Sequence, residues 1–203
     1  MKLKKMIASL VIVAALCTVT VAGSLAYFTD EVTTRNVITS GNIDIVLNEK
    51  TADGLDFPEE GISGVMPGTD VSKIVTITNT GSGTAWVRVK VDTTIKSAEG
   101  EALPLKLEDG KDVVVINFND KAADENDKSH KWFCVDGYWY YSVALQPDQT
   151  SAVLFDTVTF APEMGNEYQD CKVLVDVAAQ AVQVANNIPE GGQIDKIAGW
   201  PEA

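Results

Sequence analysis

The sequence has few of the residues that most enzymes use for metal binding or nucleophilic catalysis. It contains one histidine and three cysteines among 203 residues. Most zinc-enzyme and Ser-His-Asp schemes need more than this, so the composition argues against them. The patterns H-E-x-x-H, G-x-S-x-G, Walker A and G-x-G-x-x-G are also missing from the sequence. We therefore expect a protein that is not an enzyme and needs no cofactor.

Basic residues are also scarce. Lys and Arg number 16 against 29 Asp and Glu, which gives a formal net charge of −13 and an isoelectric point near 4.4. An acidic chain repels phosphate backbones, so nucleic-acid binding is not expected. Hydrophobic residues make up 45% and charged residues 22%, a balance that excludes a disordered chain and a membrane bundle. Self-association of such an acidic protein must come from specific backbone or apolar contacts.

The first 26 residues have the order of features found in an export signal. An apolar stretch over Met6–Val21 follows a basic start formed by Lys2, Lys4 and Lys5. Small residues come next, and Ser24-Leu25-Ala26 fits the pattern at which signal peptidases cut. We predict cleavage between Ala26 and Tyr27, with no stable membrane insertion after processing. An uncleaved anchor is the alternative, because Met6–Ala26 is just long enough to span a bilayer.

Strand patterns dominate the rest of the chain. Two-residue alternation and β-branched or aromatic residues predict about eight strands. These are Asn42–Glu49, Val71–Asn79, Ala85–Thr94, Asp112–Phe118, His130–Val135, Tyr138–Leu145, Ala152–Phe160 and Cys171–Val184. Asp136-Gly137, between two of them, predicts a tight hairpin, because a type I′ turn needs positive φ at both positions. The predicted fold class is all-β, an antiparallel β-sandwich that is jelly-roll-like.

The predicted domain boundaries follow from these patterns. Residues 27–187 form the sandwich, and residues 188–203, with two prolines and two adjacent glycines, form a mobile or peripheral C-terminal tail. Ala178–Asn186 could be a short helix. We favour a strand there, because Val173, Val175 and Val177 set a two-residue period just before it.

Several residue groups are candidate sites, and each has a plainer interpretation. Cys134 and Cys171 could form a disulfide in an exported chain or remain buried free thiols. His130 could join them around a metal, but three scattered ligands are weak evidence, and we predict no metal site. Two acidic clusters could bind calcium, yet they lack calcium-loop spacing and are better interpreted as solvated loops. The clusters are Asp120, Asp124, Glu125 and Asp127, and Asp53, Asp56, Glu59 and Glu60.

Aromatic residues are dense around the predicted hairpin. They could form an exposed platform for a carbohydrate or protein partner, or pack in the core. Alternation turns about half of the rings inward, so core packing explains most of them. The set is Trp132, Phe133, Tyr138, Trp139, Tyr140 and Tyr141.

The segment that starts at Ala26, AYFTDEVTTRNVITSGNIDIVLNE, closely resembles the start of a known group of exported proteins. The matching positions are Ala26, Phe28, Asp30, Asn36, Gly41, Ile43, Asp44, Ile45 and Leu47. Later similarities are Met66-Pro67-Gly68, Asn79, Gly81, Trp86, Arg88, Leu145, Pro147, Leu154-Phe155, Val158 and Gln183. The group is the TasA and camelysin (CalY) family, whose members are processed by the SipW-type signal peptidase of Gram-positive bacteria.

This resemblance implies a secreted protein of the cell surface or biofilm matrix, with the SipW-type signal peptidase as its partner during export. In the fibre-forming relatives, the segment after the cleavage site inserts as a strand into the next subunit. The equivalent donor here is Tyr27–Ile38. Exposed sheet edges can accept such a strand, and a head-to-tail contact that does not close gives a filament. The implied partners are copies of itself or related matrix subunits, and the apolar donor residues are Tyr27, Phe28, Val32, Val37 and Ile38.

Other interpretations stay open. The leading segment could be the first strand of its own domain or a disordered leader. The protein could also be a monomeric surface module that binds a ligand through its hairpin aromatics or acidic loops. Camelysins have been classed as metallopeptidases, but His130 stands alone and H-E-x-x-H is missing, so the sequence does not support that activity.

Overall fold

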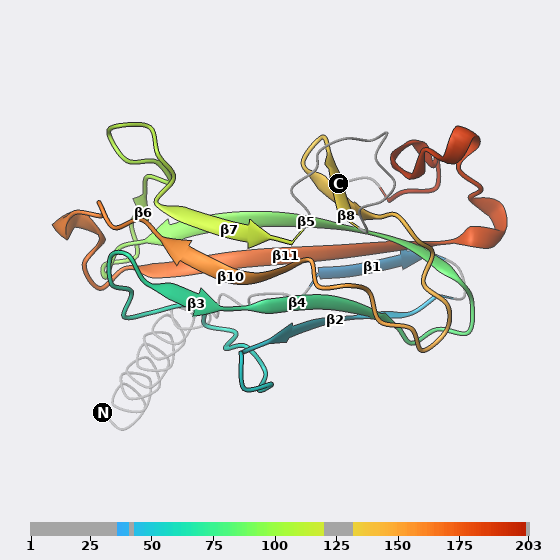
Figure 1. Cartoon of the computed structure of the whole chain (residues 1–203), viewed down its shortest axis with the longest axis horizontal. Helices are drawn as coiled ribbons and strands as arrows, with labels where there is room; N and C mark the ends of the chain where they lie inside the picture. The colour runs from blue at the N-terminus through green and yellow to red at the C-terminus, as the bar shows by residue number, and fades with distance from the viewer. Residues whose placement is uncertain (1–35, 41–42, 120–131, 202–203) are drawn as a thin grey trace, which may run out of the picture. The chain divides into compact units, whose positions relative to one another are not determined.

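The structure is a computed structural model that describes residues 36–40, 43–119 and 132–201, all within the unit Thr33–Ala203. These residues form mostly β-strands (Figure 1). The strands are β1 (Asn36–Ser40), β2 (Ile45–Lys50), β3 (Asp70–Ser72), β4 (Ile74–Asn79), β5 (Ala85–Lys96), β6 (Ala102–Leu103), β7 (Val114–Phe118), β8 (Trp132–Val135), β9 (Tyr138–Tyr141), β10 (Phe155–Phe160) and β11 (Lys172–Gln183). Short 3-10 helices are η1 (Asn166–Tyr168), η2 (Val184–Asn186), η3 (Glu190–Gly192) and η4 (Ile194–Lys196). Within the described ranges, none of the helices has the length and apolar character needed to cross a membrane.

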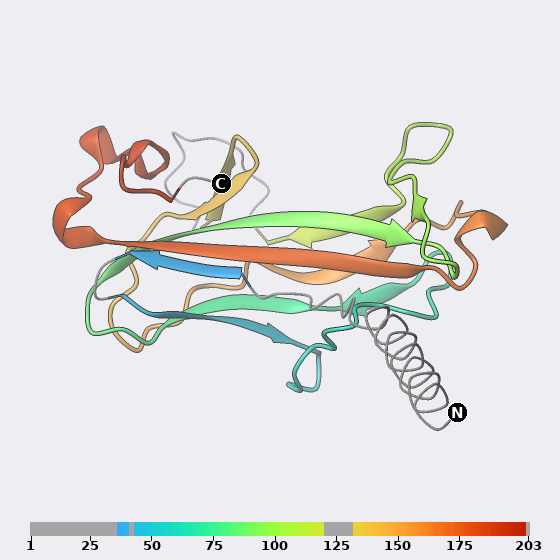
Figure 2. The ribbon, with the colours of Figure 1, turned by 180° about the vertical axis from the view of Figure 1, so that it is seen from behind.

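The larger sheet is built around two long neighbouring strands. β5 and β11 each have 12 residues and pair antiparallel over their full length, from Lys172 opposite Lys96 to Gln183 opposite Ala85. The strand order is β1-β11-β5-β9-β8, with β6 paired to one end of β5. Figure 2 shows the two long strands side by side, with β1 along β11. β1 and β8 are therefore the outer strands of this sheet.

The second layer consists of two small sheets that continue each other. β2 pairs with β4, and β10 lies between β3 and β7. A single residue, Lys73, separates β3 from β4. The chain before β10 runs along β4, where Ser151 N–H donates to Ile77 O and Leu154 N–H donates to Val75 O, both at 2.8 Å. These bonds join the two small sheets into one layer.

The hydrophobic core lies between the two layers. Val75 and Ile77 of β4 are fully buried, whereas Thr76 between them is half-buried on the opposite face. Val87 and Val89 of β5 bury their side chains in the same core. This alternation is the two-residue period of a strand with one buried face. The largest fully buried side chains are Trp132, Phe155 and Phe160.

The predicted all-β sandwich is confirmed, and its strands differ from the prediction in two respects. The predicted strand Val71–Asn79 is interrupted at Lys73, which separates β3 from β4. β1 and β6 are additional strands, and β1 runs parallel to β11 although only antiparallel pairing was predicted. The reason is that alternation reports which face of a strand is buried, but it carries no information on the direction of the neighbouring strand.

The predicted hairpin is confirmed at Asp136-Gly137. These residues have φ of 50° and 80°, and Val135 lies opposite Tyr138 across the turn. The choice of strand over helix for the segment after Val177 is also confirmed, because β11 continues to Gln183 before η2 begins.

The C-terminal tail, predicted to be mobile or peripheral, packs on the face of the larger sheet that is turned away from the main core. Ile194 and Ile197 are buried in a small apolar cluster with Phe133, Tyr140 and Val182. The physical reason is a spacing of three residues between apolar side chains. In a 3-10 helix, side chains three residues apart lie above one another, so a Gly- and Pro-rich segment can still present one apolar face.

Candidate functional site: the outer edge of β11

The strand nearest the predicted donor segment covers part of the outer edge of β11. β1 pairs parallel with β11, in register from Asn36 opposite Ala178 to Ser40 opposite Val182. It has five residues against 12 in β11 and is the last strand in the order of the sheet. In both views β1 lies along β11 on the side of β2 (Figure 1, Figure 2). A short outer strand of this kind is held to its sheet by one row of backbone hydrogen bonds.

Two of the five predicted donor residues lie in β1. Val37 is opposite Ala179 and Ile38 is opposite Gln180. The end of the predicted donor segment is thus paired within its own chain, as in the alternative that makes it the domain's first strand. The cleavage position and the other donor candidates, which lie outside the described residues, are Ala26, Tyr27, Phe28 and Val32.

The rest of the β11 edge is covered by other parts of the chain. Ile62 forms a two-way bridge with Val173, in which each N–H donates to the other's carbonyl oxygen at 2.9 Å. The Lys73 ammonium donates to Val175 O at 3.0 Å. Three groups therefore lie along this edge of β11. They are the backbone of Ile62 at Val173, the Lys73 side chain at Val175, and β1 at Ala178–Val182.

Lys73, which contacts β11, also forms a buried ion pair with β2. Its side chain is 5% exposed, and Nζ lies 2.9 Å from Oε1 of Glu49 on β2. The ammonium also lies 4.5 Å from the centroid of the Phe57 ring. Burial of a charge is costly unless it is paired and hydrogen-bonded, and here a carboxylate, a backbone carbonyl and an aromatic ring share the positive charge. Lys73 therefore links β2 in one layer to β11 in the other.

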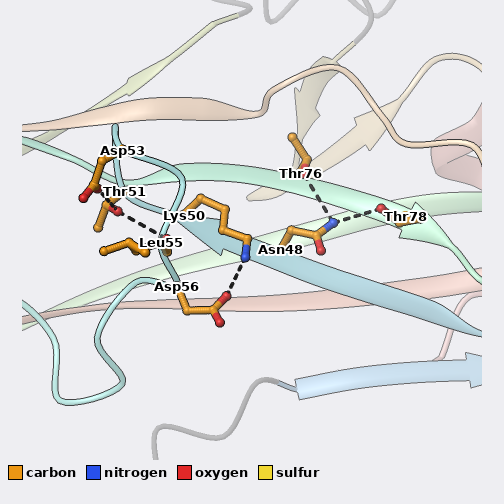
Figure 3. Close-up of polar contacts among 8 residues, drawn as sticks. All are labelled: Asn48, Lys50, Thr51, Asp53, Leu55, Asp56, Thr76 and Thr78. Atoms are coloured by element: carbon orange, nitrogen blue, oxygen red, sulfur yellow. Dashed lines mark hydrogen bonds and ion pairs between the residues drawn. The ribbon is translucent and has the colours of Figure 1, made fainter.

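β2 is the outer strand of its layer, and side chains strengthen its pairing with β4. Asn48 Nδ2 donates to Thr78 Oγ1 at 2.9 Å and to Thr76 Oγ1 at 3.4 Å (Figure 3). At the end of β2, Lys50 Nζ lies 2.8 Å from Asp56 Oδ1 in an exposed ion pair. The Asn48 contacts hold β2 in register with β4, and the Lys50–Asp56 pair ties the end of β2 to the segment that follows it.

The hairpin aromatics are divided between the two faces of the larger sheet. Trp132 and Tyr141 are buried in the main core, and Trp139 packs against it. Phe133 and Tyr140 face the other way and are covered by the C-terminal tail. The predicted core packing accounts for the first group, and the tail covers the second, so these rings do not form an open platform.

The two cysteines of the predicted sandwich are both free thiols, and the disulfide between them is not formed. Cys134 lies on β8 at the level of Val89 of β5, and Cys171 precedes β11 beyond the level of Lys96. At about 3.4 Å per residue, the stretch of β5 from Val89 to Lys96 spans about 24 Å. Disulfides need Cα atoms about 4.4–6.8 Å apart. Burial raises the pKa of both thiols above their ordinary value.

The candidate metal ligands do not gather in the described part of the chain. Within residues 43–119 and 132–201, no group of three or more His, Cys, Asp or Glu side chains could hold a metal ion. Asp56 is paired with Lys50, and Asp53 accepts a hydrogen bond from the Thr51 hydroxyl (Figure 3). The described residues therefore do not fit a catalytic metal. Outside them lie His130, Asp120, Asp124, Glu125 and Asp127.

Sequence reasoning missed two buried cations. Lys73 has the same strand parity as Val75 and Ile77, so the two-residue alternation already indicated an inward lysine. The alternation of Ala85–Thr94 puts Arg88 on the face of Trp86 and Lys90, and the C-terminal tail buries it there. No local pattern signals that burial, because it depends on a segment more than 100 residues away.

Comparison with protein families gives one match. A family model described as camelysin metallo-endopeptidase matches residues 2–130. Comparison with curated proteins and with solved structures finds no match. The matched range is more than half of the chain and includes β1, β2 and Lys73, which are parts of the site at the β11 edge. The chain therefore belongs to the camelysin family, in agreement with the resemblance of its N-terminal segment.

Proposed function

We propose that this protein is an exported structural protein of the cell surface or biofilm matrix that joins to copies of itself by strand addition. The donor is Tyr27–Ile38, and the acceptor is the outer edge of β11. Family membership supports a secreted surface protein. The observation that carries the strand-addition proposal is β1. This five-residue outer strand runs parallel to β11, which is its only partner strand in the sheet.

The physical argument is that β1 can be exchanged without loss of its bonds. Backbone hydrogen bonds between β1 and β11 do not depend on which copy supplies the strand. If β1 leaves, the edge of β11 beside Ala178–Val182 loses its partner, and unpaired edges favour addition of another strand. A strand taken from the next copy restores the pairing, and repeated head-to-tail addition gives an open filament. The acidic surface opposes other modes of association.

A register-specific cross-link tests the proposal. Asn36→Cys and Ala178→Cys place thiols on paired residues of β1 and β11. After mild oxidation, a non-reducing gel should show a ladder of covalent multimers if the strand is donated. It should show a cross-linked monomer if the strand stays in its own chain. Asn36→Cys alone is the matched control and should give neither the ladder nor the internal cross-link. A monomer-only product from assembled material would contradict strand donation.

Electron microscopy of the exported protein separates this function from a monomeric ligand-binding module. Ordered filaments are expected, and deletion of residues 27–40, which removes the donor segment together with β1, should abolish them while circular dichroism still reports a β-rich fold. Filaments unchanged by the deletion would contradict the role of the leading segment, and persistent monomers of the undeleted protein would favour the binding module. The family is described as a metallo-endopeptidase, and protein hydrolysis measured with and without a chelator tests that activity. We propose no part in it for the described residues.

A further inference from the structure

The C-terminal segment Gln193–Pro201, called here the tail segment, packs on the face of the larger sheet that is turned away from the main core. Ile194 and Ile197 are buried, and Trp200 packs beside them. Their partners on the sheet form a cluster separate from the main core and include Phe133, Tyr140 and Val182. The tail segment thus has its own small apolar interface with the sheet.

Arg88 of β5 lies at the centre of this interface. Its guanidinium carbon lies 4.0 Å from the centroid of the Tyr138 ring and 4.8 Å from that of Trp200. Nη2 donates to Pro201 O at 2.7 Å, and Nε donates to Gln180 Oε1 at 2.6 Å. A guanidinium between two aromatic rings gains cation–π energy, and more when it is shielded from water. Arg88 therefore binds both the aromatic ring and the backbone at the end of the tail segment.

The receptor side of the interface is organised by the sheet itself. Gln180 on β11 fixes the Arg88 Nε, and Tyr140 OH accepts from Nη1 at 3.3 Å. Tyr138 supplies the second ring from β9. These side chains come from three adjacent strands, so the site keeps its arrangement whether or not the tail segment is present.

The tail segment is joined to β11 by an exposed connection. Ile188 is 79% exposed, and Gly191 and Gly192 have φ of 60° and 79°. The backbone hydrogen bonds of the tail are turns within itself, such as Lys196 N–H to Gln193 O at 3.2 Å. Such turns move with the segment, because they need no backbone partner on the sheet. The tail segment is therefore held as a bound peptide would be, through its side chains and through the hydrogen bond from Arg88 to the Pro201 carbonyl.

We propose that this face of β5, β8, β9 and β11 is a peptide-binding site whose ligand is the tail segment, and that it accepts the tail segment of a second copy in place of its own. The second copy is the occupant that the structure supports, because it supplies the same Ile194, Ile197 and Trp200 spacing and the same carbonyl for Arg88. A tethered ligand acts at an effective concentration in the millimolar range, so exchange needs densely packed copies. The site lies on the face of the larger sheet and not on the edge of β11, so the inference does not depend on strand addition.

Cleavage of the connection in the folded protein tests the proposal. A recognition sequence for a specific protease is inserted between Gly191 and Gly192, and the exported protein is cut after folding. A fluorescent peptide with the sequence of residues 188–203 is then added, and its anisotropy is measured. The cut protein should bind the peptide, whereas the uncut protein should bind it about a thousandfold more weakly, because its own tail occupies the site.

The matched control is the same peptide with Trp200→Ala, which leaves the folding of the protein untouched. It should bind at least about tenfold more weakly, as truncation of a central aromatic anchor does. Equal binding of the two peptides would overturn the role of Arg88 and its rings. A cut protein that keeps a β-rich spectrum but binds neither peptide, or that unfolds on cutting, would show that the tail is an integral part of the fold and would overturn the proposal.

Discussion

Lys73 shows how one residue can limit the length of an exposed sheet edge. Its ammonium takes the Val175 carbonyl that an added strand would otherwise use, and it pairs with Glu49 of β2, which lies in the same layer as Lys73. An inward-pointing charge at a sheet edge discourages unwanted strand pairing. A donated strand beside β11 would therefore pair with residues beyond Val175, where β1 now lies.

Lys73→Met should destabilise the fold strongly. The substitution leaves the Glu49 carboxylate buried without its partner, and loss of one member of a buried ion pair costs about 3–5 kcal/mol. Urea unfolding followed by tryptophan fluorescence measures the change. Lys50→Met is the matched control, because Lys50 and Asp56 form an exposed pair, for which a cost of at most about 1 kcal/mol is expected. Similar costs for the two variants would contradict the role of Lys73.

The free thiols should react with iodoacetamide more slowly in the folded protein than in the unfolded one. Burial raises the pKa of Cys171 above its ordinary value of 9.0, so at any given pH a smaller fraction is thiolate, the reactive form. The pH at which alkylation becomes rapid should therefore lie higher in the folded state. Mass spectrometry of peptides that contain Cys134 and Cys171 measures both rates. A Cys134–Cys171 disulfide in the isolated protein would contradict the structure.

The strands show which elements the sequence could predict. Asp136-Gly137 specifies its own turn, and Val87 and Val89 specify the buried face of β5, because both signals are local. The parallel pairing of β1 and the burial of Arg88 under the tail depend on segments far apart in the sequence, and alternation carries no information about them. For the same reason no sequence pattern indicates that Val37 and Ile38 pair with β11 of their own chain, and the donor role of their segment stays a prediction.

Gly81→Ala should destabilise the connection between β1 and β2. A Cβ at Gly81 would lie 2.6 Å from Asp44 N and 3.1 Å from Ile43 Cα, both backbone atoms that cannot move independently. Gly81 N–H also donates to Asp44 O at 3.0 Å. We expect a loss of about 1–3 kcal/mol in urea unfolding, as for other overpacked sites. Thr80→Ala, at the exposed neighbouring position, should change stability by less than about 0.5 kcal/mol.

At the scale of the molecule, charge and edge pairing act against each other. A net charge of −13 makes copies repel, whereas the proposed strand addition at the β11 edge would bring them into contact through uncharged backbone groups. Repulsion between like-charged surfaces is screened by salt, and backbone pairing is not. We therefore predict that the rate of assembly depends on ionic strength.

Assembly of the exported protein should accelerate when salt is raised from 0.01 to 0.15 M, because the Debye length falls from about 30 Å to about 8 Å and the acidic subunits repel one another less. Light scattering over time measures the rate, and the deletion of residues 27–40, which removes the donor segment and β1, should remove the signal at every salt concentration. Sucrose at matched osmolarity is the control and should leave the rate nearly unchanged, because it does not screen charge. A rate that falls as salt rises would mean that the subunits attract through opposite charges, and it would contradict assembly by backbone pairing against a repulsive surface.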